Sequence, residues 1–180
     1  MVVATTMAIC PKFCKPYKIE APCKKILEVI YTNDEYIMAY HIRQWEDLMK
    51  MEEGEEDTIV GIDVEYTSPE DGDNQRAALM QLCIGKKVLL YHISEADRRC
   101  FKFDDFLLNR RYTFAGFSIK RDIELLEKSG LYVSNFVDIQ EKWRVPKPYK
   151  PLDSLADVAE LIIDEDYGNM KVGFSFTDHC

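Results

Sequence analysis

The stretch TIVGIDVEY, residues 58 to 66, decides the fold of this chain. It is rich in β-branched side chains, which favour a strand. Successive side chains of a strand point to opposite faces, so Asp63 and Glu65 share one face while Ile62 and Val64 share the other. The apolar run before Asp63 predicts a central strand whose two faces are both largely covered.

The two acidic residues of this strand, Asp63 and Glu65, suggest a site. Neighbouring carboxylates repel each other, and burying them without partners is costly. A divalent cation between them would remove that cost, and hard cations such as Mg²⁺ and Mn²⁺ favour oxygen ligands. The alternative interpretation is a strand with one polar face turned to solvent.

The segments on either side of this strand predict a mixed sheet. Gly85-Lys86-Lys87 separates two short apolar runs and indicates a hairpin. Later strands alternate with helices, which is typical of an α/β domain whose sheet is not all parallel. Strands are expected at 26–31, 78–84, 88–91, 112–118 and 135–138, and helices at 33–50, 96–108, 120–129 and 155–163.

The helix expected at 33–50 carries local signals of its own. Thr32 and Glu35 have the spacing of a capping box at its start. Four large side chains are expected near one face: Ile37, Tyr40, Trp45 and Leu48. Near the other end of the chain, Ser154 or Asp153 is expected to cap the helix at 155–163.

A second acidic position follows a glycine. In the segment 114–122 (FAGFSIKRD), a strand ends near Ser118 and a helix opens with Asp122 in its first turn. Ligands of α/β sheets bind beyond the carboxyl ends of strands, so Asp122 is expected at the rim of a site. Alternatively, an acidic residue in a first turn only complements the helix dipole.

Composition places the chain among single-domain proteins. It has 180 residues and a formal net charge of −9, and no apolar stretch approaches the ~20 residues of a membrane helix. We expect one domain over residues 25–180, preceded by a flexible extension, 1–24, outside the core. We therefore expect neither a secretory signal nor a membrane partner.

The cysteines indicate a reducing compartment. Their spacing is irregular, which predicts free thiols and a location in the nucleus or cytoplasm. Cys10, Cys14 and Cys23 are close in sequence, but no fourth zinc ligand accompanies them, so we interpret them as thiols of the extension.

Taken together, these motifs resemble the Werner-syndrome-type 3′→5′ exonuclease domains of the DEDD superfamily. Residues 61–66 resemble the first exonuclease motif, and 116–122 the second, with glycine and aspartate six positions apart. Residues 78–83 (ALMQLC) resemble the strand after the first motif, 152–155 (LDSL) a later helix start, and 171–177 the segment that leads to the third motif.

The resemblance implies a ribonuclease H-like mixed sheet flanked by helices, a nucleic-acid 3′ end as substrate, and two Mg²⁺ or Mn²⁺ ions about 3.5–4 Å apart. It implies that Asp63 bridges both metals, that Glu65 binds the metal holding the attacking water, and that Asp122 binds the other. Tyr66, directly after the first motif, is a candidate contact for the terminal nucleotide.

The resemblance has one gap. The family's third motif supplies a fourth carboxylate and the tyrosine or histidine that orients the water, and it is not found before Asp178-His179-Cys180 closes the sequence. Catalysis depends steeply on placement of the reacting groups. We therefore expect a domain truncated at its C-terminus with weakened or absent cleavage, or alternatively a non-catalytic module that binds nucleic acid or protein.

Overall fold

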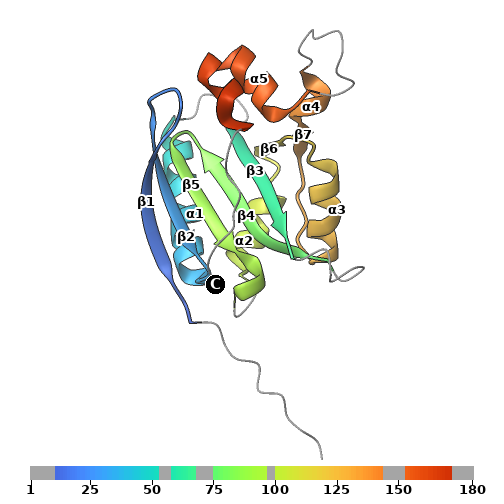
Figure 1. Ribbon diagram of the computed structural model, residues 1–180. Helices are drawn as coiled ribbons and strands as arrows, with labels where there is room; N and C mark the ends of the chain where they lie inside the picture. Colours follow the sequence, from blue (N-terminus) through green and yellow to red (C-terminus); the bar gives the residue numbers. More distant parts are fainter. Residues whose placement is uncertain (1–10, 53–57, 68–74, 97–99, 144–152, 172–180) are drawn as a thin grey trace, which may run out of the picture.

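A seven-stranded mixed sheet is the frame of the molecule (Figure 1). The computed structural model describes residues 11–52, 58–67, 75–96, 100–143 and 153–171. The spatial order of the strands is β1-β2-β5-β4-β3-β6-β7, which places β3 inside the sheet. The strands are β1 Cys14–Glu20, β2 Ile26–Thr32, β3 Thr58–Tyr66, β4 Ala77–Ile84, β5 Lys87–His92, β6 Tyr112–Gly116 and β7 Phe136–Asp138.

Parallel and antiparallel pairs are mixed as the sequence predicts. β4 and β5 form the expected antiparallel hairpin, with Gly85 at a φ of 57° in its turn. β3 pairs antiparallel with β4 and parallel with β6, and β6 pairs parallel with β7. The α/β class and the mixed sheet are therefore confirmed.

Helices connect the strands and cover the sheet. They are α1 Glu35–Glu52, α2 Phe101–Leu108, α3 Lys120–Lys128, α4 Ile139–Lys142 and α5 Leu155–Ile162, with short 3-10 segments at Ile93–Glu95 and Glu165–Lys171. Ser154 caps α5, and its hydroxyl accepts from the Asp157 amide, as predicted. No helix among the described residues is both long enough and apolar enough to cross a membrane.

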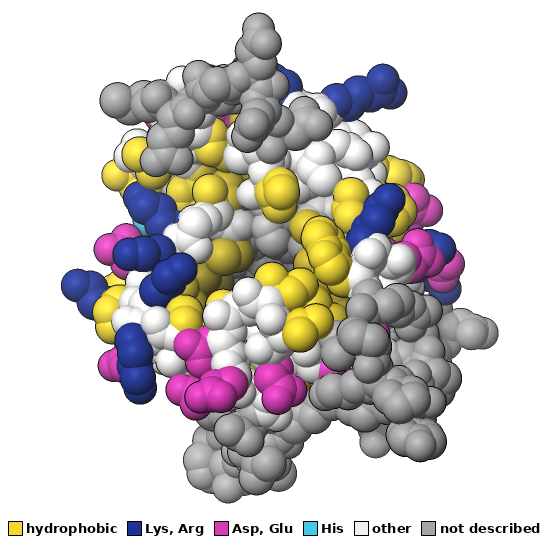
Figure 2. All heavy atoms as spheres, turned by 90° about the horizontal axis from the view of Figure 1, so that it is seen from above, with side chains coloured by type: hydrophobic (Ala, Val, Ile, Leu, Met, Phe, Trp, Pro, Cys, Tyr) yellow, Lys and Arg dark blue, Asp and Glu magenta, His cyan; other side chains and the backbone are white. Residues whose placement is uncertain are grey.

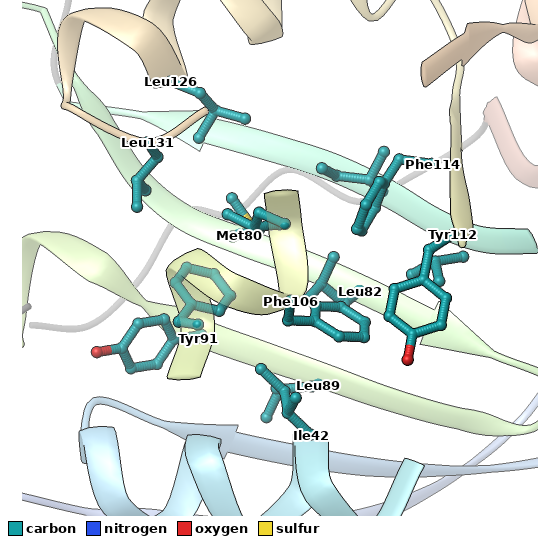
Figure 3. Packing of buried hydrophobic residues seen from close by; sticks show 14 of the residues in the cluster. Ile42, Met80, Leu82, Leu89, Tyr91, Phe106, Tyr112, Phe114, Leu126 and Leu131 are labelled. Carbon is teal, nitrogen blue, oxygen red and sulfur yellow. The ribbon is translucent and has the colours of Figure 1, made fainter. Parts of the chain in front are cut away.

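The hydrophobic core lies on one face of the sheet. Val60, Ile62 and Val64 of β3 are buried there together with residues of α1, α2 and α3. Figure 3 shows Phe106 of α2 beside Phe114 and Leu82 of the sheet. Packing of large side chains from three helices against these residues fixes the position of β3. It therefore also fixes the positions of Asp63 and Glu65, which alternate with the core residues along the strand.

The opposite face of β3 is open, which corrects one expectation. Ile59 is 65% exposed, and Asp63 and Glu65 are exposed too. The prediction that both faces of this strand are largely covered is therefore wrong. An apolar residue such as Ile59 on an open face carries the same sequence signal as one in a core, so the pattern could not separate the two cases.

Helix α1 packs through a different stripe from the one we expected. Met38, Ile42, Trp45 and Met49 are buried, whereas Tyr40 is 57% exposed and Leu48 39% exposed. Only Trp45 belongs to both sets. The buried positions follow the 3.6-residue repeat, and Tyr40 and Leu48 lie to one side of it.

The N-terminal extension contains a strand. Cys14–Glu20 pairs antiparallel with β2 along its whole length, so these residues of the expected extension belong to the sheet, although none of them lies in the hydrophobic core. All of β1 is exposed, which removes the alternating pattern that reveals a strand in sequence. Lys15, Pro16 and Lys18 are residue types that protect an edge strand from pairing with another chain.

Two residues just before β1 contact the start of α1. The Thr32 hydroxyl donates to the Phe13 carbonyl at 2.6 Å, and Glu35 pairs with Lys12 at 2.7 Å. The Thr32 hydroxyl also accepts from the Asp34 amide at 3.0 Å, as predicted, whereas Glu35 is engaged by Lys12. Asp34 adds a further cap, because its Oδ1 accepts from the Tyr36 amide at 2.8 Å.

Candidate active site

The acidic residues of β3 lie where its neighbouring strands have ended. β3 pairs with β6 from Thr58 to Gly61, and β6 ends at Gly116. β7 ends at the same level, because Asp138 is the partner of Gly116. β3 continues to Tyr66, so Asp63 and Glu65 project beyond the carboxyl ends of two parallel strands, which is where α/β sheets place their sites.

Gly116 brings α3 close to this edge. A Cβ at this position would lie 2.8 Å from the Ile62 carbonyl oxygen and 2.6 Å from Ile119 Cδ1. Only glycine therefore permits this approach between β6, β3 and the start of α3. Strand β6 ends two residues earlier than predicted, because Ser118 adopts a positive φ of 58° and turns the chain into the helix.

Asp122 lies in the first turn of α3, as predicted. Burial raises its pKa from the ordinary 3.8 to about 7, and the charges of Asp63, Glu65 and Asp138 raise it further in that order. Burial raises the pKa of Asp63 as well. Burial and the Asp63 charge raise the pKa of Glu65. The fold thus gathers three acidic residues from β3 and α3 into one electrostatic unit.

Hydrogen bonds position two of these carboxylates. Gln81 of β4, which faces Asp63 in register, donates through Nε2 to Asp63 Oδ2 at 2.8 Å. The Tyr66 hydroxyl donates to Asp122 Oδ1. A register shift between Glu65 and Tyr66 marks a bulge, a device that re-aims side chains beside functional sites.

Tyr66 therefore has a contact that the sequence did not reveal. Its role as a contact for the terminal nucleotide stays a prediction. In the structure its hydroxyl is engaged with the carboxylate of α3. The two residues are 56 positions apart, and no local pattern predicts such a pair.

A hollow of about 350 Å³ adjoins Asp63 on the open face of the sheet. Mostly apolar residues line it, from β3, β4, β5, β6, α4 and α5, and they include Cys83, Val88, Ile139 and Leu155. The Asp63 side chain is accessible to solvent, but protein atoms of the hollow surround it on several sides. This partial loss of hydration raises its pKa. Seen from above, hydrophobic side chains gather around the middle of the molecule (Figure 2).

The donor set suits a hard divalent cation, because three carboxylates approach one another. Among the described residues, however, no three His, Cys, Asp or Glu side chains are already arranged to hold a metal ion. The Asp122 carboxylate is turned to Tyr66 instead. The residues therefore provide the right ligand chemistry without a preformed cluster.

Asp138 is the acidic residue that sequence reasoning missed. It is only 8% exposed, and its Oδ1 accepts from the Ser118 amide at 3.0 Å and from the Gln140 amide at 2.9 Å. Its charge also contributes to the raised pKa of Asp122. Its place at the end of the strand expected at 135–138, level with the other carboxyl ends, is the signal that could have identified it.

Most of the cysteines lie among the described residues, whereas the C-terminal segment does not. Cys14, Cys23, Cys83 and Cys100 are free thiols, which confirms that expectation for these four. Cys23 accepts a hydrogen bond from the Tyr167 hydroxyl at 3.4 Å. Cys10 and nearly all of the segment expected to lead to the third motif, 172–177, lie outside the described residues.

The fold matches those of solved exonuclease domains. The Nibbler EXO domain of Aedes aegypti superposes with a TM-score of 0.54 and 15% identity, over 74% of this chain and 67% of that one. The catalytic core of RRP6 from Trypanosoma brucei gives 0.55 and 14%, over 73% and 34%. The EXD2 exonuclease domain soaked in Mg gives 0.52 and 16%, over 62% and 56%.

Other comparisons set the limit of this likeness. EXD2 was also solved after soaking in Mn and GMP. No protein-family model matches the chain, and no curated protein sequence matches it either. The chain spans little more than half of the EXD2 domains that it matches. At these identities the similarity shows the fold, a ribonuclease H-like exonuclease fold, and it does not show the activity.

Proposed function

We propose that this chain is a metal-dependent 3′→5′ exonuclease domain that hydrolyses phosphodiester bonds at nucleic-acid 3′ ends. The observation that carries the proposal is the mutual action of Asp63, Glu65 and Asp122. The two β3 charges help to hold the pKa of Asp122 at about 7. Carboxylates whose pKa values are raised by burial and by one another are typical of functional sites.

The proposal assigns the metal to these carboxylates. Asp63, Glu65 and Asp122 would hold Mg²⁺ or Mn²⁺, and the bound ions would stabilise the attacking and leaving oxygens. Asp122 would turn from the Tyr66 hydroxyl toward Asp63 to complete the set. Gln81 holds Asp63 in place from β4. The solved EXD2 domains soaked in Mg and in Mn with GMP support this choice of ion and of substrate class.

The experiment is digestion of oligonucleotides with a label at the 5′ end, in DNA and in RNA form, with Mg²⁺, with Mn²⁺ and with a chelator. Metal-dependent shortening by single nucleotides from the 3′ end is the expected result. Asp63→Asn should abolish it, whereas Asp105→Asn, a change at an exposed aspartate of α2, should not. Cleavage that survives both chelation and Asp63→Asn would refute the assigned site.

A second candidate is a non-catalytic module that binds nucleic acid or protein through the same face. The hydrogen bond from the Tyr66 hydroxyl to Asp122 favours it, because it engages one of the three carboxylates that the metal would need. It predicts oligonucleotide binding that is unchanged by chelation and is not accompanied by cleavage. Fluorescence anisotropy of a labelled oligonucleotide, run beside the digestion, separates the two candidates.

A further inference from the structure

The turn that leads from β6 into α3 is held by a residue of another strand. Ser118 has a φ of 58°, which is rare and strained for a residue with a side chain. Its amide donates to Asp138 Oδ1 at 3.0 Å. Asp138 is 8% exposed, so this bond is largely shielded from water.

Asp138 connects this turn to the start of α4 as well. The oxygen that receives the Ser118 amide also receives the Gln140 amide, which caps α4. Lys120, at the start of α3, pairs with Glu141 of α4. Both partners of that ion pair are more than half exposed, so it contributes little. Asp138 is therefore the main link between the end of β7 and the start of α3.

This link bears on the site because Asp122 follows Ser118 within one helical turn. Gly116 already holds the chain against β3, since a Cβ there would reach the Ile62 carbonyl oxygen at 2.8 Å. From that fixed point the direction of α3 depends on the conformation of Ser118. A change of φ at Ser118 would swing the first turn of α3 and move Asp122 relative to Asp63.

We propose that Asp138 is a positioning residue: by holding Ser118 in its left-handed conformation, it places Asp122 beside Asp63 and Glu65. This inference rests on the proposed function, because it gives the position of Asp122 a purpose in metal binding. It requires Asp138 to touch neither the metal nor the substrate.

The test uses the rescue that the geometry predicts. Asp138→Ala should weaken Mn²⁺ binding, measured by calorimetry, about tenfold, and should lower kcat more than it changes KM. Adding Ser118→Gly to Asp138→Ala should restore most of both, because glycine adopts a positive φ without strain. Asp138→Asn keeps an acceptor oxygen and should lose less than Asp138→Ala. A role confined to capping α4 would not respond to Ser118→Gly.

Two results would overturn the proposal: Asp138→Ala that binds Mn²⁺ like the parent protein, or a loss that Ser118→Gly fails to restore. If Asp138→Ala does not fold by circular dichroism, Asp138→Asn with and without Ser118→Gly carries the same comparison. Failure of the proposed function looks different, because then the parent protein and Asp63→Asn both lack Mn²⁺ binding.

Amide exchange keeps the inference testable in that case. In metal-free protein, Asp138→Ala should accelerate exchange at Ser118 and through the first turn of α3, and Ser118→Gly should reverse the effect in that turn. Unchanged exchange would overturn the positioning role whatever the activity of the chain.

Discussion

Replacing Asp122 by asparagine is expected to stabilise the metal-free protein in alkaline solution. The pKa of Asp122 is raised from 3.8 to about 7, so its ionised form is disfavoured in the folded state. Between these values the folded protein keeps a proton that the unfolded chain has released. The free energy of unfolding of the parent protein should therefore fall as pH rises from about 4 to about 7 and stay low above that.

The size of the effect follows from the shift. A rise from 3.8 to about 7 corresponds to roughly three pH units. At about 1.4 kcal/mol per unit, the ionised carboxylate would cost ~4 kcal/mol at most. Asp122 is partly exposed, and solvent screening reduces this to about 2 kcal/mol. Asparagine stays neutral and keeps an oxygen that can accept from Tyr66, so it removes the charge with little other change.

The assay is urea denaturation in the presence of a chelator at pH 5, 6, 7 and 8. Asp122→Asn should exceed the parent protein by about 2 kcal/mol at pH 8 and by a smaller margin at pH 5, because the unfolded parent chain has already released its proton there. Asp105→Asn, at an exposed aspartate on α2, serves as the control and should show no such divergence. Adding Mn²⁺ at pH 8 should reverse the order, because a ligand that binds only the folded state stabilises it.

One outcome would refute the reasoning. If Asp122→Asn is no more stable than the parent protein at pH 8 without metal, then neither burial nor the charges of β3 disfavour the ionised Asp122 carboxylate in the folded chain. The electrostatic unit proposed for the site would then not exist, whatever the fold.

Three further outcomes follow from the same corner of the structure and from α5. Gly116→Ala should destabilise the protein by about 2 kcal/mol in urea denaturation and reduce Mn²⁺ binding, because the added methyl group has only backbone and Ile119 to displace. Tyr66→Phe should lower stability by about 1 kcal/mol because a hydrogen bond is lost. It should also tighten Mn²⁺ binding up to fivefold, because the hydroxyl competes with the metal for Asp122. Weaker Mn²⁺ binding by this variant would contradict the competition. Ser154→Ala should lower stability by about 1 kcal/mol by removing the α5 cap, with no change in Mn²⁺ binding, as seen by the same two measurements.

The parts of the fold that the sequence predicts well are those where one local rule dominates. β3 matches the expected 58–66, because a β-branched run with alternating charge fits only a strand. Ile119, Ile123 and Leu126 are buried as the helical repeat requires. Gly130 ends α3 with a φ of 76°, the conformation expected for a helix C-terminus.

The parts that it misses depend on contacts between distant segments. In α1 two neighbouring stripes of large apolar side chains were available, and packing against the sheet selected the one that contains Met38 and Ile42. β1 has no buried face and hence no period. The start of α1 differs from the expected capping box because Lys12 and Phe13, just before β1, are partners of Glu35 and Thr32.

The candidate site shows the same division. Alternation along β3 placed Asp63 and Glu65 on one face, and the strand-to-helix turn placed Asp122 at the rim, both from sequence alone. Whether these residues meet depends on Gly116, Ser118 and the register of three strands, which a linear pattern does not contain. The contribution of Asp138 came only from strand pairing, because its partner Gly116 lies in another strand.

The energetics of this corner argue against an accidental cluster. A fold selected for stability alone would not place Asp122 where burial and three neighbouring charges raise its pKa to about 7. It would also not hold Ser118 at a positive φ with a nearly buried carboxylate beside it. Both costs fall on the residues that bring α3 against β3, and local strain of this kind concentrates at functional sites. A bound divalent cation would stabilise the ionised form of Asp122, which is unfavourable in the metal-free protein. The carboxylate that destabilises the free protein would then contribute to metal affinity.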